Sequence, residues 1–344
     1  MQDSLSATDN RSVGVAIWGA GWVASGHLSA FLAHPHAEVV AIGSRREGPC
    51  RALLASHGLD IPVYTNYDRL LDDSRVDAVV ICTPNQLHAD ETIRAARAGK
   101  HILIEKPVAL NLEELRAAQA AVRAAGVTTV AGFVVRWTPL IESLKQIVAQ
   151  GDLGEIYLAN AAYWSWRSAR PQFQKSRATA VSPWLVGGCH AIDAIRYVSG
   201  LEVTEVSGFA SPAGPAYGYD YDCVQAAAVQ WSNGATGTFT TAIVGHTPYQ
   251  FDLDLLGSKG TARNKKLYLD RLPGDAEFFE LPVTGQDSSD VIHHTFGGEI
   301  DHFVRCVRTG ERSHIDLDDA ARTHEIAFAI EQSVREHRSV RLPL

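Results

Sequence analysis

The chain has 344 residues, and at about 100 to 200 residues per domain this length predicts two domains. Its 46% hydrophobic and 20% charged residues describe an ordinary globular protein, while the net charge of -8 argues against nucleic acid or an anionic membrane as the main partner. The five scattered cysteines include no C-x-x-C pair, and there is no signal-peptide core or run of about 18 apolar residues, so we expect a cytoplasmic protein without a disulfide framework, zinc knuckle or membrane span.

The first element is a strand, glycine turn and helix. Residues 13–17 form a branched apolar run typical of a buried parallel strand, and the run breaks at Gly19-Ala20-Gly21. Gly19 permits a tight turn, Gly21 lets backbone amides approach a phosphate, and Ala24 supplies the third small position. A helix begins here, and its N-terminus favours a pyrophosphate. The alternative is an ordinary turn of this type with no ligand.

Strands and helices then alternate as far as residue 135. Helices are expected at 44–57, 67–71, 89–98 and 112–125, and further strands at 39–43, 61–64, 76–82, 101–104 and 128–135. This alternation predicts an α/β fold whose N-terminal domain, residues 1–135, is a doubly wound parallel (Rossmann) sheet.

Residues 136–344 show a different rhythm. Long extended runs are expected at 156–166, 203–210, 222–231, 235–244 and 251–256, and Ser232-Asn233-Gly234 is a hairpin signal between two of them. Helices are expected at 183–199, 299–309 and 318–336. We therefore expect a C-terminal α/β domain for substrate binding and oligomerisation, with a large, mainly antiparallel sheet; its last two helices are free to pack back on the first domain.

Polar clusters follow three of the predicted parallel strands. These are Ser44-Arg45-Arg46, Thr83-Pro84-Asn85 with His88, and Glu105-Lys106-Pro107. Ligands of open α/β sheets lie beyond the carboxyl ends of the strands, so the recurrence indicates a binding site. The position before a proline at the end of a buried strand is unfavourable for a lysine whose charge is only solvated. The alternative is a surface lysine paired with Glu105.

These segments resemble the signature set of the glucose-fructose oxidoreductase, inositol dehydrogenase and related (Gfo/Idh/MocA) oxidoreductases. The resemblance also includes the segment from Gly132-Phe133 to Arg136, Gly187-Gly188-Cys189-His190 with Asp193, Gly298-Glu299-Ile300 with His302-Phe303, and the final five residues. It covers nearly the whole chain, and the E-K-P tripeptide is its most specific part. It implies a two-domain protein that binds a nicotinamide dinucleotide and usually oxidises or reduces a sugar, inositol or sugar derivative.

The resemblance makes Lys106 the active-site lysine and His190 the histidine at the start of the second-domain helix. When a hydride leaves a carbinol carbon the hydroxyl proton must also leave, so a histidine suits the base and an ammonium stabilises the developing alkoxide. Asp193, one turn further on, is expected to orient His190 or a substrate hydroxyl. Inositol dehydrogenase-like members often carry an aspartate where this chain has Val186, so the carboxylate partner at that position is missing and Asp193 is the candidate to replace it. The alternative for His190 is a core histidine bonded to backbone.

The expected site residues lie at the turn, the strand ends and the second-domain helix. Catalytic residues are Lys106, His190 and Asp193; cofactor-binding residues are Gly19, Ala20, Gly21, Trp22, Val23, Ser44, Arg45, Thr83, Pro84, Asn85, His88, Glu105, Lys106 and Arg136. Substrate-binding residues are Lys106, Trp166, Arg167, Lys175, His190 and Asp193. Aromatic rings and cations near Trp166 suit a polyhydroxylated ring, but packing against a helix or subunit explains the aromatics equally well. No metal is expected, because His293-His294 lacks acidic or cysteine partners at ligand spacing.

Ser44 stands where an NAD enzyme usually carries Asp or Glu, and Arg45 and Arg46 follow it, which favours NADP over NAD. The function expected first is an NAD(P)-dependent oxidoreductase acting on a carbinol or keto carbon of a sugar, cyclitol or derivative. The alternatives are a glycosidase that uses tightly bound NAD through transient oxidation and elimination, and a non-catalytic dinucleotide-binding sensor. A broad second-domain sheet face not covered by the 183–199 helix predicts a homodimer or homotetramer.

Overall fold

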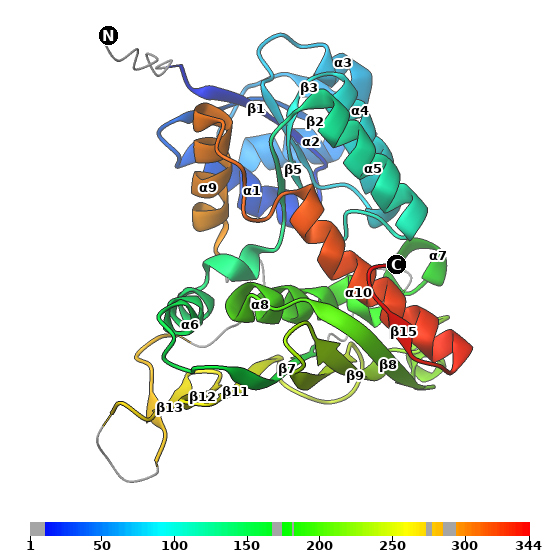
Figure 1. The fold of residues 1–344 in the computed structure, drawn as a ribbon. Coiled ribbons are helices and arrows are strands. Elements are labelled where there is room, and N and C mark those ends of the chain that lie inside the picture. The colour runs from blue at the N-terminus through cyan, green and yellow to red at the C-terminus, as the bar shows by residue number, and fades with distance from the viewer. Residues whose placement is uncertain (1–10, 167–173, 181, 273–276, 285–293) are drawn as a thin grey trace. The chain divides into compact units, whose positions relative to one another are not determined.

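A computed structural model describes residues 11–166, 174–180, 182–272, 277–284 and 294–344. The chain divides into two compact units (Figure 1). The first unit comprises Met1–Val108, Glu113–Gly132 and Phe296–Asp319, and the second comprises Ala109–Leu112, Phe133–Thr295 and Ala320–Leu344. The expected domain boundary at residue 135 stays a prediction.

The first unit is built on a six-stranded sheet in the order β3-β2-β1-β4-β5-β6. All its strand pairs are parallel, which confirms the predicted doubly wound sheet. The strands are β1 (Val13–Trp18), β2 (Ala37–Gly43), β3 (Val63–Tyr64), β4 (Ala78–Ile81), β5 (His101–Ile104) and β6 (Thr129–Ala131). β1 and β4 are buried along their whole length because helices cover both faces of the sheet.

The helices of the first unit match the predicted alternation closely. They are α1 (Trp22–Leu32), α2 (Glu47–Ser56), α3 (Tyr67–Leu71), the 3-10 turn η1 (Asn85–Leu87), α4 (His88–Arg97), α5 (Leu112–Ala125) and α9 (Phe296–Thr309). α9 packs beside α1 (Figure 1), with the Phe31 and Phe303 rings 6.5 Å apart. The strand expected at 128–135 is shorter than predicted: β6 stops before Gly132, where a Cβ atom would lie 3.1 Å from the Glu105 carboxylate.

The second unit contains a nine-stranded sheet in the order β14-β13-β12-β11-β7-β10-β9-β8-β15. Its strands are β7 (Ile156–Trp164), β8 (Val203–Ser211), β9 (Val224–Trp231), β10 (Thr236–Ala242), β11 (Gln250–Gly257), β12 (Gly260–Arg263), β13 (Lys266–Leu269), β14 (Phe279–Glu280) and β15 (Val340–Arg341). β7 and β10 pair in parallel and the other described pairs are antiparallel, so the predicted mainly antiparallel sheet is confirmed. The 232–234 hairpin joins β9 to β10 as predicted.

Helices cover one face of this sheet. The second unit contains η2 (Val134–Trp137), α6 (Pro139–Ala149), α7 (Arg177–Ala180), the π-helical turn η4 (Trp184–Gly188), α8 (Cys189–Ser199), η5 (Gly214–Tyr217) and most of α10 (Leu317–Glu336). The single helix expected at 183–199 is therefore a π turn followed by an α-helix. α10 also reaches the sheet, since the Ser333 hydroxyl accepts a hydrogen bond from the Gly208 amide at 2.9 Å. None of the described helices has the length and apolar character of a membrane span.

Candidate functional site

The glycine turn after β1 accepts only glycine at one position and is open at another. Gly19 has φ of +125°, and a Cβ atom there would lie 2.5 Å from the Cys82 carbonyl oxygen, so only glycine fits. Gly21 is the N-cap of α1 and provides no side chain to cap it, while the space where its Cβ would point is open. A phosphate is favoured at a helix N-terminus of this kind. Ala20 and Val23 are partly exposed, and Trp22 is 51% exposed.

Ser44 follows β2 and shapes the next segment. Its hydroxyl donates to the Arg46 carbonyl oxygen at 2.6 Å and accepts from the Cys50 thiol at 3.4 Å. Arg45 and Arg46 are exposed, and among the described residues neither guanidinium forms an ion pair. Two unneutralised cations therefore stand at the end of this strand.

His88 links the segments that follow β4 and β5. One ring nitrogen lies 2.7 Å from the Pro107 carbonyl oxygen and the other 2.8 Å from the Thr83 carbonyl oxygen. Burial lowers the pKa of this imidazole, which is almost inaccessible to solvent. His88 is thus a buried bridge that holds the Thr83-Pro84-Asn85 segment against Pro107, rather than a side chain facing a ligand.

Glu105 and Lys106 follow β5, as predicted. The Glu105 carboxylate lies 2.8 Å from Nε2 of His27 on α1, whereas Lys106 is partly exposed. Glu299, in the first turn of α9, is fully buried nearby, and both its oxygens have no hydrogen-bond partner among the described residues. Burial, followed by the charge of Glu105, raises the pKa of Glu299 well above its ordinary value.

The second unit places His190 at the start of α8. The imidazole is buried. Its ring centroid lies 5.9 Å from that of the Phe133 ring, which is edge-on, and 6.4 Å from that of the Tyr163 ring, which is stacked. A Cβ atom at Gly187 would lie 2.2 Å from Cε1 of Tyr163, so glycine there lets the tyrosine approach. The π turn η4 contains this glycine, and such turns occur frequently at functional sites.

Asp193 forms an ion pair with Arg136. Its carboxylate receives bonds from Nε and Nη2 of Arg136 at 2.7 and 2.6 Å, and the two side chains are 1% and 2% exposed. Thr323 of α10 donates to the same carboxylate at 3.2 Å. The structure thus joins Asp193 to Arg136, which was expected to bind the cofactor, and makes their ion pair part of the second unit's core.

The predicted substrate-binding residues beyond β7 are only partly described. The ring centroids of Trp166 and His246 are 4.8 Å apart, and Nζ of Lys175 donates to the Tyr217 carbonyl oxygen at 3.3 Å. Arg167 and His293 lie outside the described residues. Along β7, Tyr163 faces the helices and Trp164 faces the opposite side, as the expected alternation requires. Within the described ranges no group of three or more His, Cys, Asp or Glu side chains is arranged to hold a metal.

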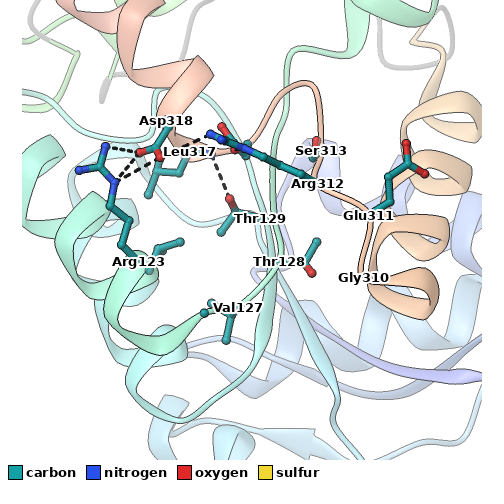
Figure 2. A pocket seen from close by; sticks show the side chains of 13 residues that line it. Arg123, Val127, Thr128, Thr129, Gly310, Glu311, Arg312, Ser313, Leu317 and Asp318 are labelled. Atoms are coloured by element: carbon teal, nitrogen blue, oxygen red, sulfur yellow. Dashed lines mark hydrogen bonds and ion pairs between the residues drawn. The ribbon is translucent and has the colours of Figure 1, made fainter.

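A surface pocket of about 270 Å³ lies elsewhere in the first unit (Figure 2). It is lined by the end of α5, residues 127–129 and the connection from α9 to α10. Residues 127–129 lead into β6, so this pocket is at the amino edge of the parallel sheet, opposite to the strand-end segments. Its charges are paired: Asp318 accepts from Nη2 of Arg123 at 2.7 Å and lies 3.6 Å from Arg312.

Sequence reasoning missed His27, Trp18 and Glu91 in the first unit, and Tyr163 on β7 in the second unit. Trp18, the last residue of β1, donates from its indole to the Glu91 carboxylate at 2.7 Å. A tryptophan at the end of a buried strand indicates a buried hydrogen bond, because its indole N–H needs an acceptor. The identity of that acceptor, 73 residues away, has no local signal.

Two family models match the chain. Residues 13–133 match an oxidoreductase family with an NAD-binding Rossmann fold, and residues 141–263 match the GFO/IDH/MocA C-terminal domain. The chain is 27% identical over 317 residues to scyllo-inositol 2-dehydrogenase (NAD(+)) of Bacillus subtilis, covering 90% of each chain. It is 26% identical over 338 residues to myo-inositol 2-dehydrogenase of Thermotoga maritima, covering 95% of this chain and 98% of the relative.

A solved structure shares the fold of this chain. The crystal structure of an oxidoreductase domain protein from Kribbella flavida superposes with a TM-score of 0.87 at 21% identity, covering 97% of this chain and all of the other. The glycine turn, the parallel sheet and both family matches lead to one conclusion: the chain is a member of the Gfo/Idh/MocA family of nicotinamide-dependent oxidoreductases.

Proposed function

We propose that the protein oxidises a secondary hydroxyl of a cyclitol or sugar, or reduces the corresponding ketone, with Lys106 and His190 as catalytic residues. The observation that carries this proposal is the buried imidazole of His190, packed against Tyr163 where Gly187 allows it. The substrate class is supported by the two relatives named as inositol dehydrogenases, which match over nearly their whole length.

Each residue has a defined part in the chemistry. A bound nicotinamide would supply the acceptor for the hydride of the carbinol carbon. His190 takes the hydroxyl proton as the C–O bond gains double-bond character, and returns a proton to the oxygen in the reverse direction. Lys106 stabilises the negative charge that develops on that oxygen. Asp193 acts indirectly, by holding Arg136 within the core beneath α8.

The dinucleotide is proposed to lie along the strand-end segments of the first unit. The uncapped N-terminus of α1 and the open space at Gly21 suit the pyrophosphate. Ser44 and Arg45 suit the adenosine end, and Thr83, Asn85 and Lys106 the nicotinamide end. The placement follows from the rule that such ligands lie beyond the carboxyl ends of parallel strands.

NADP is proposed as the preferred cofactor. The Ser44 hydroxyl is used in holding the turn, so Arg45 and Arg46 would bind the 2′-phosphate, and their exposed guanidinium groups are suited to it. The B. subtilis relative is named for NAD(+), so both cofactors must be compared directly. We expect kcat/KM to favour NADP in the wild type and to shift towards NAD in Ser44→Asp. A wild-type preference for NAD, or an unchanged ratio in the variant, contradicts the proposal.

The activity itself is tested with a substrate panel. The purified protein is passed through gel filtration and assayed at the nicotinamide absorbance band with inositol isomers and aldoses, with and without added dinucleotide. Turnover that needs added dinucleotide supports a dehydrogenase. Retained cofactor with turnover of glycosides and no net absorbance change would instead support redox-neutral chemistry.

Association through the open face of the second unit's sheet is also proposed. Phe209 of β8 is 73% exposed, and its cross-strand neighbour Ala226 of β9 is exposed beside it. The same row continues through Thr240 and Ala162 on β10 and β7. This row, on the face opposite to the helices, suits a second copy of the chain, as a dimer or a tetramer built from dimers.

A further inference from the structure

The ends of β1, β2 and β4 are connected through one buried indole. The Trp18 side chain, at the end of β1, is 3% exposed, and its ring fills the space beside Gly43 at the end of β2. A Cβ atom at Gly43 would lie only 2.6 Å from the indole carbon Cζ3, so no larger residue fits there while Trp18 keeps this position. Trp18 therefore fixes the spacing between the chain leading to the glycine turn and the chain leading to Ser44.

Glu91 of α4 binds this indole and also binds the end of β4. One carboxylate oxygen accepts the Trp18 indole N–H at 2.7 Å, and the other accepts the Thr83 hydroxyl. Trp18 precedes Gly19, and Thr83 opens the Thr83-Pro84-Asn85 segment. A single carboxylate, 5% exposed, thus joins two strand-end segments that are adjacent in the sheet.

The two donors fix the carboxylate from both sides. The Trp18 ring also packs against the Tyr67 ring at 4.8 Å, and the Tyr67 hydroxyl donates to the main-chain carbonyl oxygen of Glu91 at 3.1 Å. Two charge-assisted bonds to one buried carboxylate are stronger than neutral hydrogen bonds and define its orientation. The arrangement resists a relative shift of the segments that it joins.

We propose that Trp18 and Glu91 are positioning residues for the dinucleotide, holding the segments at the ends of β1, β2 and β4 at the spacing that the bound cofactor requires. Neither side chain is proposed to touch the cofactor. The inference rests on the proposed placement of the dinucleotide along these segments. Without the contacts made by Trp18 and Glu91, the ligand would have to order these segments when it binds. The conformational entropy lost in that ordering would weaken binding.

The test measures dinucleotide binding by calorimetry, with NADP and NAD as separate probes, in four variants. Glu91→Leu removes both acceptors, and Trp18→Phe removes the indole donor. Glu91→Gln keeps an oxygen for Trp18 and can donate its amide to the Thr83 hydroxyl. Tyr67→Phe is the matched control, because it deletes a buried hydrogen bond to the backbone of Glu91 and leaves the carboxylate bonds in place.

We expect Glu91→Leu and Trp18→Phe each to raise the Kd by about tenfold or more, and Glu91→Gln and Tyr67→Phe by less than about threefold. With substrate, KM for the dinucleotide should rise while kcat at saturating dinucleotide stays within about threefold of wild type. A Kd of Trp18→Phe equal to that of the wild type overturns the proposal, and so does a Kd of Tyr67→Phe that rises as much as that of Trp18→Phe. If Glu91→Leu does not fold, the Kd of Trp18→Phe alone tests the proposal. A wild-type protein that binds no dinucleotide would instead refute the proposed placement of the cofactor.

Discussion

Replacing Asp193 with asparagine separates a structural role of this residue from a chemical one. The substitution keeps the size of the side chain but removes the charge that compensates Arg136. Both side chains are almost fully buried, and the pair makes two bonds shorter than 2.8 Å. Breaking such a pair by changing one partner costs about 3 to 5 kcal/mol, because a buried charge is left without compensation. At about 2 to 4 °C per kcal/mol for a domain of this size, Tm should fall by roughly 6 to 20 °C.

The assay is thermal and urea unfolding together with kcat at a temperature where the variant is folded. Asp254→Asn is the matched control, since Asp254 makes a similar pair with Arg263 on the surface of the same unit. That exposed pair should contribute about 1 kcal/mol or less. We expect Asp193→Asn to lose stability and keep most of its kcat. An unchanged Tm with a loss of kcat of about 10² or more would show that Asp193 takes part in proton transfer and refute the structural interpretation.

Three further results are expected. Gly187→Ala should displace the Tyr163 ring, lower the stability by about 1 to 3 kcal/mol and reduce kcat. Gly297→Ala, in open space on α9, should leave stability and kcat unchanged. Equal effects of the two substitutions would contradict the packing argument. Burial raises the pKa of Glu299 in the folded state above the value of about 4.3 in the unfolded chain, so stability is lost as pH rises from about 4.3 towards the raised pKa. Glu299→Gln should therefore raise Tm more at pH 8 than at pH 5. Phe209→Asp should reduce the mass found by light scattering to that of a monomer, and an unchanged oligomer mass would place the interface elsewhere.

Local signals were sufficient for most of the first unit. β5 and α5 have the predicted bounds, because a short apolar run and a helical pattern ended by Gly126 need no tertiary information. The predicted end of β6 was wrong: the apolar pattern continues to Val135, but the chain turns into the 3-10 helix η2 at Val134. The π turn before α8 has the same apolar residues as an α-helix, so its residue pattern did not reveal it.

The candidate site was predicted as a set of segments, and its internal contacts were not. Alternating strands and helices place polar residues at one edge of the sheet, which is why Lys106 and Thr83 were chosen. The partners of Asp193 and Trp18 are 57 and 73 residues away in the chain, and only the folded structure brings them together. Two residues selected for chemistry, His88 and Asp193, are thus found in buried networks that hold the segments in place.

The most direct test of the proposed chemistry is the hydride-transfer rate of Lys106→Ala and His190→Ala at saturating dinucleotide and substrate, followed at the nicotinamide band. If these residues stabilise the alkoxide and accept its proton, each variant should lose about 10² or more in kcat while its dinucleotide Kd, measured by calorimetry, stays near that of the wild type. Near-normal turnover in either variant would contradict the account.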